Sequence, residues 1–242
     1  MPAASISTSP ETPLQTLPET SPEAPKDVVL VHGLWHRPSH LEALRVVLTD
    51  LGYDVRVPEL HRGSLAADVA AVQQVVDSCA APPLLLGHSY GGAVIGQISG
   101  AAGMLFVAAF VLEAGESCSG HSSPPSAAPA IDFLEDGRSL IRPELAREYF
   151  YADCRPEDAD AAIADLRPQA PGHGRATASR VTWRDVPTRY VVCSEDRALH
   201  PDIQRRLAAR CDSSAEIAAS HSPFLSEPER IAAEVVQFAN QV

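Results

Sequence analysis

Lysine is almost absent from this sequence, in which Lys26 is the only one among 242 residues. Enzymes that form a Schiff base need a lysine amine. The single lysine lies in or beside the predicted tail, so the chain offers no candidate for that chemistry. Basic residues as a whole are few, with 19 against 31 acidic ones and a formal net charge of −12. This balance opposes attraction to nucleic acids and to anionic membranes, so we expect neither as a partner.

Long hydrophobic runs and a secretory signal are also missing. The longest apolar stretch, residues 101–112, contains Gly103 and is too short to cross a bilayer. Residues 1–26 lack the positive and apolar regions of a signal peptide and are rich in Pro, Ser, Thr, Ala and Glu, which predicts a disordered tail. The five cysteines are odd in number and show no C-x-x-C spacing. They favour neither a disulfide framework nor a zinc site, and they predict a cytoplasmic protein.

The remaining chain, residues 27–242, shows strands and helices in alternation. Apolar, β-branched runs predict strands at residues 27–31, 53–57, 84–86, 104–111, 188–193 and 215–218. Helical spacing of apolar residues predicts helices at residues 39–51, 64–79, 90–99, 201–210 and 227–239. This order is typical of an α/β domain with a mostly parallel six-stranded sheet and helices on both faces.

The alternation breaks between about residues 113 and 184. This segment contains Pro-rich loops and two helical pieces, at residues 143–151 and 156–166. An insertion at the carboxyl end of a strand lies over a site built from the other strand ends, so we expect a small helical cap. Its aromatic residues are candidates for the pocket face, although most of them could instead form the core of the cap: Phe133, Tyr149, Phe150 and Tyr151.

The most informative stretch is an apolar strand that runs into Gly-His-Ser-Tyr-Gly at residues 87–91. Gly87 and Gly91 permit a sharp turn from strand to helix, with Ser89 at its apex and its hydroxyl exposed. Because a serine hydroxyl is a poor nucleophile at neutral pH, Ser89 would need a base and an orienting carboxylate.

Two later strand ends supply these groups in the required order. Asp196 follows the strand at residues 188–193, and His221 follows the next strand. Glu195 is a rival for the acid because it is one residue away. The backbone N–H groups of Leu34 and Tyr90 are the candidates for stabilising an oxyanion, one after an early strand and one after the nucleophile.

These motifs resemble one family. From Val28 to its end, the chain is similar to the small capped α/β-hydrolases that include plant methyl-ester esterases, hydroxynitrile lyases and many bacterial esterases. The resemblance lies in Val-His-Gly at 31–33, Gly-His-Ser-Tyr-Gly at 87–91, Ser-Glu-Asp-Arg at 194–197 and Ser-His-Ser-Pro-Phe at 220–224. It implies Ser89 as nucleophile, His221 as base, Asp196 as acid, and Leu34 and Tyr90 as oxyanion donors.

Departures from the family narrow the chemistry. The hydroxynitrile lyases place a lysine directly after the catalytic histidine, where this chain has Ser222, so that mechanism is disfavoured. Haloalkane dehalogenases of the same fold need an aspartate where this chain has Ser89, so that class of enzyme is excluded. His32, His36 and His40 have the spacing of metal ligands, but His32 lies in the strand-end loop and no carboxylate motif accompanies them, so we expect no metal.

The sequence therefore predicts a serine hydrolase of a small, largely apolar carboxylic ester, without a cofactor. Candidates for the pocket lining are His32, Trp35, His88, Phe110, Phe133, Phe150 and Phe224. Two alternatives stay open: a non-hydrolytic lyase, eliminase or cyclase that uses the same residues, and a receptor-like binding protein with negligible turnover. The sequence carries no signal for the oligomeric state.

Overall fold

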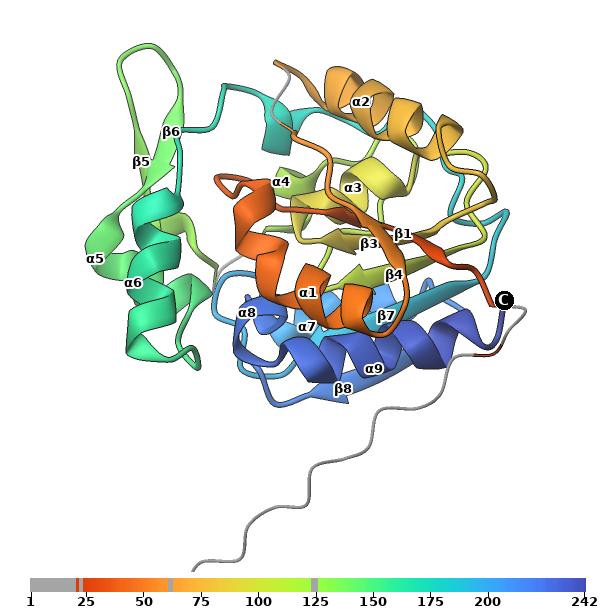
Figure 1. The fold of residues 1–242 in the computed structure, drawn as a ribbon. Coiled ribbons are helices and arrows are strands. Elements are labelled where there is room, and N and C mark those ends of the chain that lie inside the picture. Colours follow the sequence, from red (N-terminus) through yellow and green to blue (C-terminus); the bar gives the residue numbers. More distant parts are fainter. Residues whose placement is uncertain (1–20, 22–23, 61–62, 123–125) are drawn as a thin grey trace, which may run out of the picture.

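A parallel six-stranded sheet forms the centre of the protein (Figure 1). The computed structural model describes residues 21, 24–60, 63–122 and 126–242. The strands of the sheet are β1 (Asp27–Val31), β2 (Asp54–Arg56), β3 (Leu84–His88), β4 (Gly103–Val107), β7 (Thr188–Cys193) and β8 (Ser213–Ile217). They lie in the order β2-β1-β3-β4-β7-β8, and every neighbouring pair is parallel, which confirms the predicted α/β architecture.

Helices cover both faces of the sheet. They are α1 (Glu42–Asp50), α2 (Leu65–Asp77), α3 (Tyr90–Ile95), α7 (Pro201–Ala208), α8 (Pro223–Ser226) and α9 (Pro228–Ala239). In β1, Val29 and Val31 pack with α2, α3 and α7, whereas Val28 and Leu30 pack with α1, α8 and α9 (Figure 1). Successive side chains of a strand point to opposite faces, so burial on both sides explains the continuous apolar runs.

The end of β4 differs from the predicted strand, which extended to residue 111. The strand stops at Val107, because Ala108 has a φ of +44° and turns the chain out of the sheet. The Tyr190 hydroxyl holds this turn by accepting a hydrogen bond from the Ala109 N–H (2.9 Å) and donating one to the Ala109 carbonyl (2.7 Å). The apolar residues that follow Val107 are therefore available to line a site.

Residues 113–184, between β4 and β7, correspond to the expected cap and are called the cap segment here. Its helices are α4 (Cys118–His121), α5 (Pro143–Phe150) and α6 (Pro156–Asp165), with short 3-10 turns at η2 (Ala128–Ala130) and η3 (His173–Arg175). α5 and α6 match the two predicted helical pieces. The segment also contains an antiparallel hairpin, β5 (Ile131–Phe133) and β6 (Ser139–Ile141), which the predicted loops and helical pieces did not include. Its strands have three residues each and are mostly not buried, so the Asp136-Gly137 turn is the clearest sequence signal of the hairpin.

The predicted tail, residues 1–26, lies largely outside the described residues. Of the part that is described, Ala24 is buried against the α1 and α9 side of the sheet, and the Ser21 N–H donates to the Asn240 side-chain carbonyl at 2.8 Å. All five cysteines carry free thiols. Within the described ranges, no helix has the length and apolar character needed to span a membrane.

Candidate active site

Ser89 occupies a strained turn between β3 and α3. Its φ is +53°, a region that non-glycine residues rarely adopt. The turn is tight: a Cβ added to Gly87 would lie 2.9 Å from the Gly91 carbonyl, and one added to Gly91 would overlap the Val31 carbonyl oxygen. The two glycines are thus required for the approach of strand and helix that presents Ser89.

We expect Gly91→Ala to lower the free energy of unfolding by about 3 kcal/mol, because the new methyl group collides with backbone that belongs to β1. Urea denaturation measures this. Gly120→Ala is the control, since its Cβ would lie at an ordinary 3.5 Å from the Ser117 hydroxyl. Equal stability of the two variants would contradict the tight approach of the elbow to β1.

Asp196 and His221 meet at the ends of neighbouring strands. Asp196 follows β7, His221 follows β8, and the His221 Nδ1 lies 2.7 Å from the Asp196 Oδ2. Both residues are 2 % exposed. Glu195, the rival acid, is exposed at the surface and does not contact this histidine. The carboxylate that can orient His221 is therefore that of Asp196.

The Asp196 carboxylate is held by four donors. Its Oδ1 accepts the N–H groups of Ala198 (2.7 Å) and Leu199 (2.9 Å), and its Oδ2 accepts the Gln204 side-chain N–H (2.7 Å) besides that of His221. Gln204 was missed at the sequence level. Its only signal there is a polar residue on the buried face of α7. These contacts keep the carboxylate in one orientation within a buried site.

The loop after β1 lies directly against the elbow. A Cβ on Gly33 would be 3.0 Å from the Cβ of Ser89. The Leu34 carbonyl accepts the His36 Nδ1–H at 2.8 Å, and the Tyr151 hydroxyl then donates to the His36 Nε2 at 3.0 Å. This chain of bonds turns the Leu34 carbonyl toward His36 and links the loop to the cap segment.

Tyr90, the other candidate oxyanion donor, begins α3. Its side chain is fully buried, and its hydroxyl donates to the Asp68 carboxylate on α2 at 2.8 Å. Only the main chain of Tyr90 is therefore available to the site in front of Ser89.

The loop that carries His221 is fixed from two sides. The His88 Nε2–H donates to the His221 carbonyl at 2.8 Å. From the cap segment, the Asp153 carboxylate accepts the Ser220 N–H at 2.8 Å and the Ser226 hydroxyl at 3.0 Å. Asp153 had no distinguishing pattern in the sequence, because its role depends on where the cap folds.

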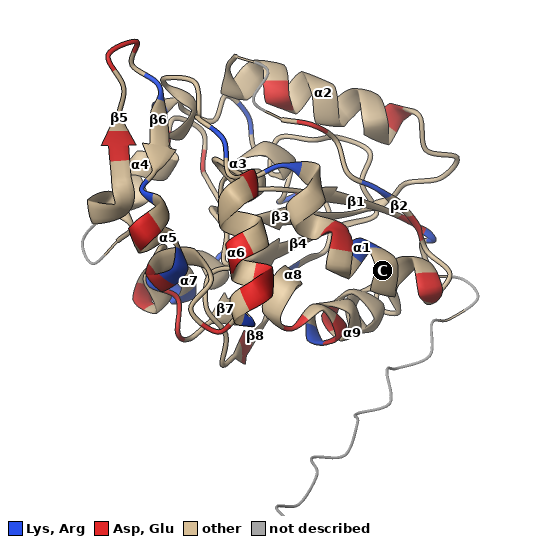
Figure 2. Ribbon diagram, turned by 60° about the vertical axis from the view of Figure 1, so that its left-hand side comes forward, with Lys and Arg blue, Asp and Glu red and all other residues tan. Residues whose placement is uncertain are grey.

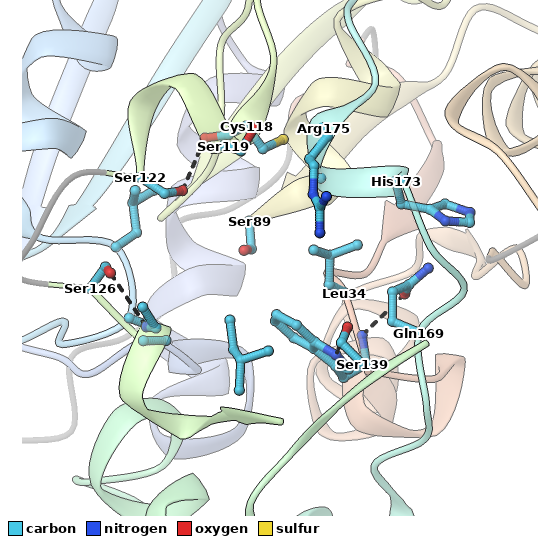
Figure 3. A pocket seen from close by; sticks show the side chains of 18 of the residues that line it. Leu34, Ser89, Cys118, Ser119, Ser122, Ser126, Ser139, Gln169, His173 and Arg175 are labelled. Atoms are coloured by element: carbon cyan, nitrogen blue, oxygen red, sulfur yellow. Dashed lines mark hydrogen bonds between the residues drawn. The ribbon is translucent and has the colours of Figure 1, made fainter. Parts of the chain in front are cut away.

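Ser89 and His221 open onto one cavity of about 230 Å³, which Figure 3 shows from close by. Trp35, Phe110, Phe133 and Phe150 line it, as predicted, together with Leu34. The prediction was wrong for three residues that are buried behind the cavity wall: His32, His88 and Phe224. Adjacency to a motif placed them near the site, but their side chains pack into the protein core beneath it.

A group of histidines is buried around the site. Burial lowers the pKa of His32 to about 3, and the same cause lowers the pKa values of His36, His40 and His88. These imidazoles are therefore neutral at physiological pH. The His36 ring stacks edge-on against those of His40 and His88, at 4.7 Å and 5.6 Å between ring centres.

We expect the protein to lose stability on acidification. Unfolded His32 binds a proton below about pH 6.5, whereas folded His32 does so only near pH 3, so the free energy of unfolding falls as the pH drops between these values. His32 alone would contribute a loss of about 2 kcal/mol at pH 5. Urea unfolding at pH 7 and pH 5 measures the loss, and His32→Gln should reduce its pH dependence. An unchanged wild-type midpoint would contradict this expectation.

The same histidines do not form a metal site. Both ring nitrogens of His36 are hydrogen-bonded, and those of His40 contact the Ala162 carbonyl (3.0 Å) and the Arg37 N–H (3.0 Å). Across the described part of the chain, no group of three or more His, Cys, Asp or Glu residues is arranged to hold a metal ion.

The chain belongs to the Alpha/beta hydrolase family, whose model matches residues 28–234. It is 26% identical to the alpha/beta hydrolase nvfD of Aspergillus novofumigatus, over 84% of this chain and 92% of that protein. It is also 26% identical to a pyrethroid hydrolase of Sphingobium wenxiniae, over 88% of each chain. The crystal structure of a pyrethroid hydrolase from Sphingobium faniae has the same fold, with a TM-score of 0.80, 24% identity and coverage of 89% of this chain and 97% of that one.

Proposed function

We propose that this protein is a serine esterase that cleaves a small, largely apolar carboxylic ester through an acyl-enzyme. One observation carries the proposal: Ser89 and His221 open onto the same cavity, and His221 is held from behind by Asp196 at 2.7 Å. A nucleophile, a base and an orienting carboxylate in this relation are what acyl transfer requires. Membership of a hydrolase family and the 26% identity to a pyrethroid hydrolase support the same reaction class.

In this mechanism the Ser89 hydroxyl attacks the ester carbonyl while the His221 Nε2 takes its proton. Asp196 accepts the Nδ1–H and keeps the imidazole in the tautomer that can act as a base. The N–H groups of Leu34 and Tyr90 stabilise the oxyanion of the tetrahedral intermediate. His221 then gives its proton to the leaving alcohol and activates a water that hydrolyses the acyl-enzyme.

The cavity supports a mostly apolar substrate. Its wall includes aromatic and aliphatic side chains from both the core domain and the cap segment: Leu34, Trp35, Phe110, Ile131, Phe133, Phe150 and Leu199. A volume of about 230 Å³ is at the small end of ligand pockets. We therefore expect short or medium acyl chains to be preferred over long ones.

Stopped-flow hydrolysis of para-nitrophenyl esters of increasing acyl length tests the proposal. We expect sustained turnover and a maximum of kcat/KM at a chain length that the cavity accommodates. A burst of one equivalent without turnover would contradict the esterase and favour a ligand-capturing protein. No reaction with any ester would favour a non-hydrolytic enzyme that uses His221 as a base.

A further inference from the structure

One side chain with a permanent charge lines the cavity. Among the described lining residues, Arg175 is the only Lys or Arg, and no Asp or Glu is present. Figure 3 shows its guanidinium directed toward the space in front of Ser89 and Leu34. Arg175 is exposed, so solvent hydrates its charge, and a guanidinium that faces the cavity is available to an anionic group of a ligand.

Within the described part of the chain, Arg175 has no ionic partner. No carboxylate of the described residues lies within 4.0 Å of its guanidinium, although most arginines of this chain are paired. Its guanidinium carbon lies 6.0 Å from the centre of the Phe133 ring, at the β5–β6 hairpin. Both side chains are exposed, so this contact leaves the N–H donors of Arg175 available to a ligand.

We propose that Arg175 forms a subsite for a carboxylate, and that the substrate is an ester bearing a carboxylate remote from its scissile carbonyl. This inference rests on the proposed esterase function and names its substrate class. A guanidinium offers paired N–H donors whose geometry matches a carboxylate.

The charge of the protein as a whole favours a selective role for Arg175. The chain carries a net charge of −12, and α6 has four acidic residues and no basic one (Figure 2). Long-range attraction of an anion to this protein is therefore weak. Preference for a carboxylate must come from a local cation, and Arg175 is the Lys or Arg that the described lining residues supply.

The test compares two para-nitrophenyl esters of equal acyl length. One is the monoester of pimelic acid, which carries a terminal carboxylate, and the other is the ester of heptanoic acid, which ends in a methyl group. We expect the wild-type protein to have the higher kcat/KM for the pimelate ester. Arg175→Gln should lower the ratio of the two kcat/KM values about tenfold, because it removes a charge-assisted hydrogen bond in a partly solvated site.

Arg206→Gln is the matched control, because it removes the same charge from an exposed position of α7 outside the cavity and should leave the ratio unchanged. A ratio that is the same in wild type and Arg175→Gln would overturn the subsite while leaving the esterase intact.

If neither ester is hydrolysed, the proposed esterase function is refuted. A binding measurement then still tests the carboxylate subsite. Calorimetric titration of Ser89→Ala with monomethyl pimelate and with methyl heptanoate should show tighter binding of the pimelate. Adding Arg175→Gln should abolish this preference. Equal affinity for the two compounds in Ser89→Ala would overturn the carboxylate subsite on its own.

Discussion

Ser89→Ala is expected to lower kcat for ester hydrolysis by about 10⁶-fold, the loss known for nucleophile removal in other serine hydrolases. In the proposed mechanism the Ser89 hydroxyl forms the covalent acyl-enzyme, and no neighbouring group is expected to replace it. Residual hydrolysis would come from binding and oxyanion stabilisation alone. Steady-state and single-turnover assays with para-nitrophenyl esters measure the change.

Two further variants separate loss of the nucleophile from loss of the fold. Ser89→Gly should be as inactive as the alanine variant but more stable, by about 1 kcal/mol, because glycine adopts the φ of +53° without strain. Ser119→Ala removes another hydroxyl of the cavity wall and should change kcat less than tenfold. Substantial turnover in Ser89→Ala, beyond a contaminating activity, would refute the proposed nucleophile.

The sheet and the elbow were predictable because their physical requirements are local. A strand that is buried on both faces is apolar over most of its length, so β1, β3 and β4 stand out in the sequence. The turn at Ser89 tolerates only glycine at positions 87 and 91, where any side chain meets backbone. The order of strand ends then placed Asp196 and His221 on adjacent strands, and they lie 2.7 Å apart.

The β5–β6 hairpin and the supports of the site could not be predicted, because they depend on contacts between distant segments. Asp153 holds the His221 loop across 67 positions of sequence, and Gln169 contacts Trp35 across 134. His88 is next to Ser89 in the chain, yet its ring faces the carbonyl of His221 instead of the cavity. Sequence proximity shows which loop a residue belongs to, whereas its side-chain direction is decided by packing.

Asp196→Asn is expected to lower kcat by about 10⁴-fold, although it changes one atom. The Ala198 and Leu199 N–H groups both donate to Oδ1, so the amide oxygen of the new asparagine must stay at that position. Its NH₂ group then replaces Oδ2 and faces the Gln204 N–H and the His221 Nδ1.

His221 can meet that NH₂ group only by presenting an unprotonated Nδ1, which moves its proton to Nε2 and leaves no lone pair there to accept the Ser89 proton. The loss should therefore appear in kcat more than in KM. Glu195→Gln is the control, because it makes the same change from carboxylate to amide one residue away. The exposed Glu195 side chain makes no hydrogen bond or ion pair with His221, so kcat should stay within a factor of about two. The reverse ranking of the two variants would make Glu195 the acid and would require the loop after β7 to rearrange on substrate binding.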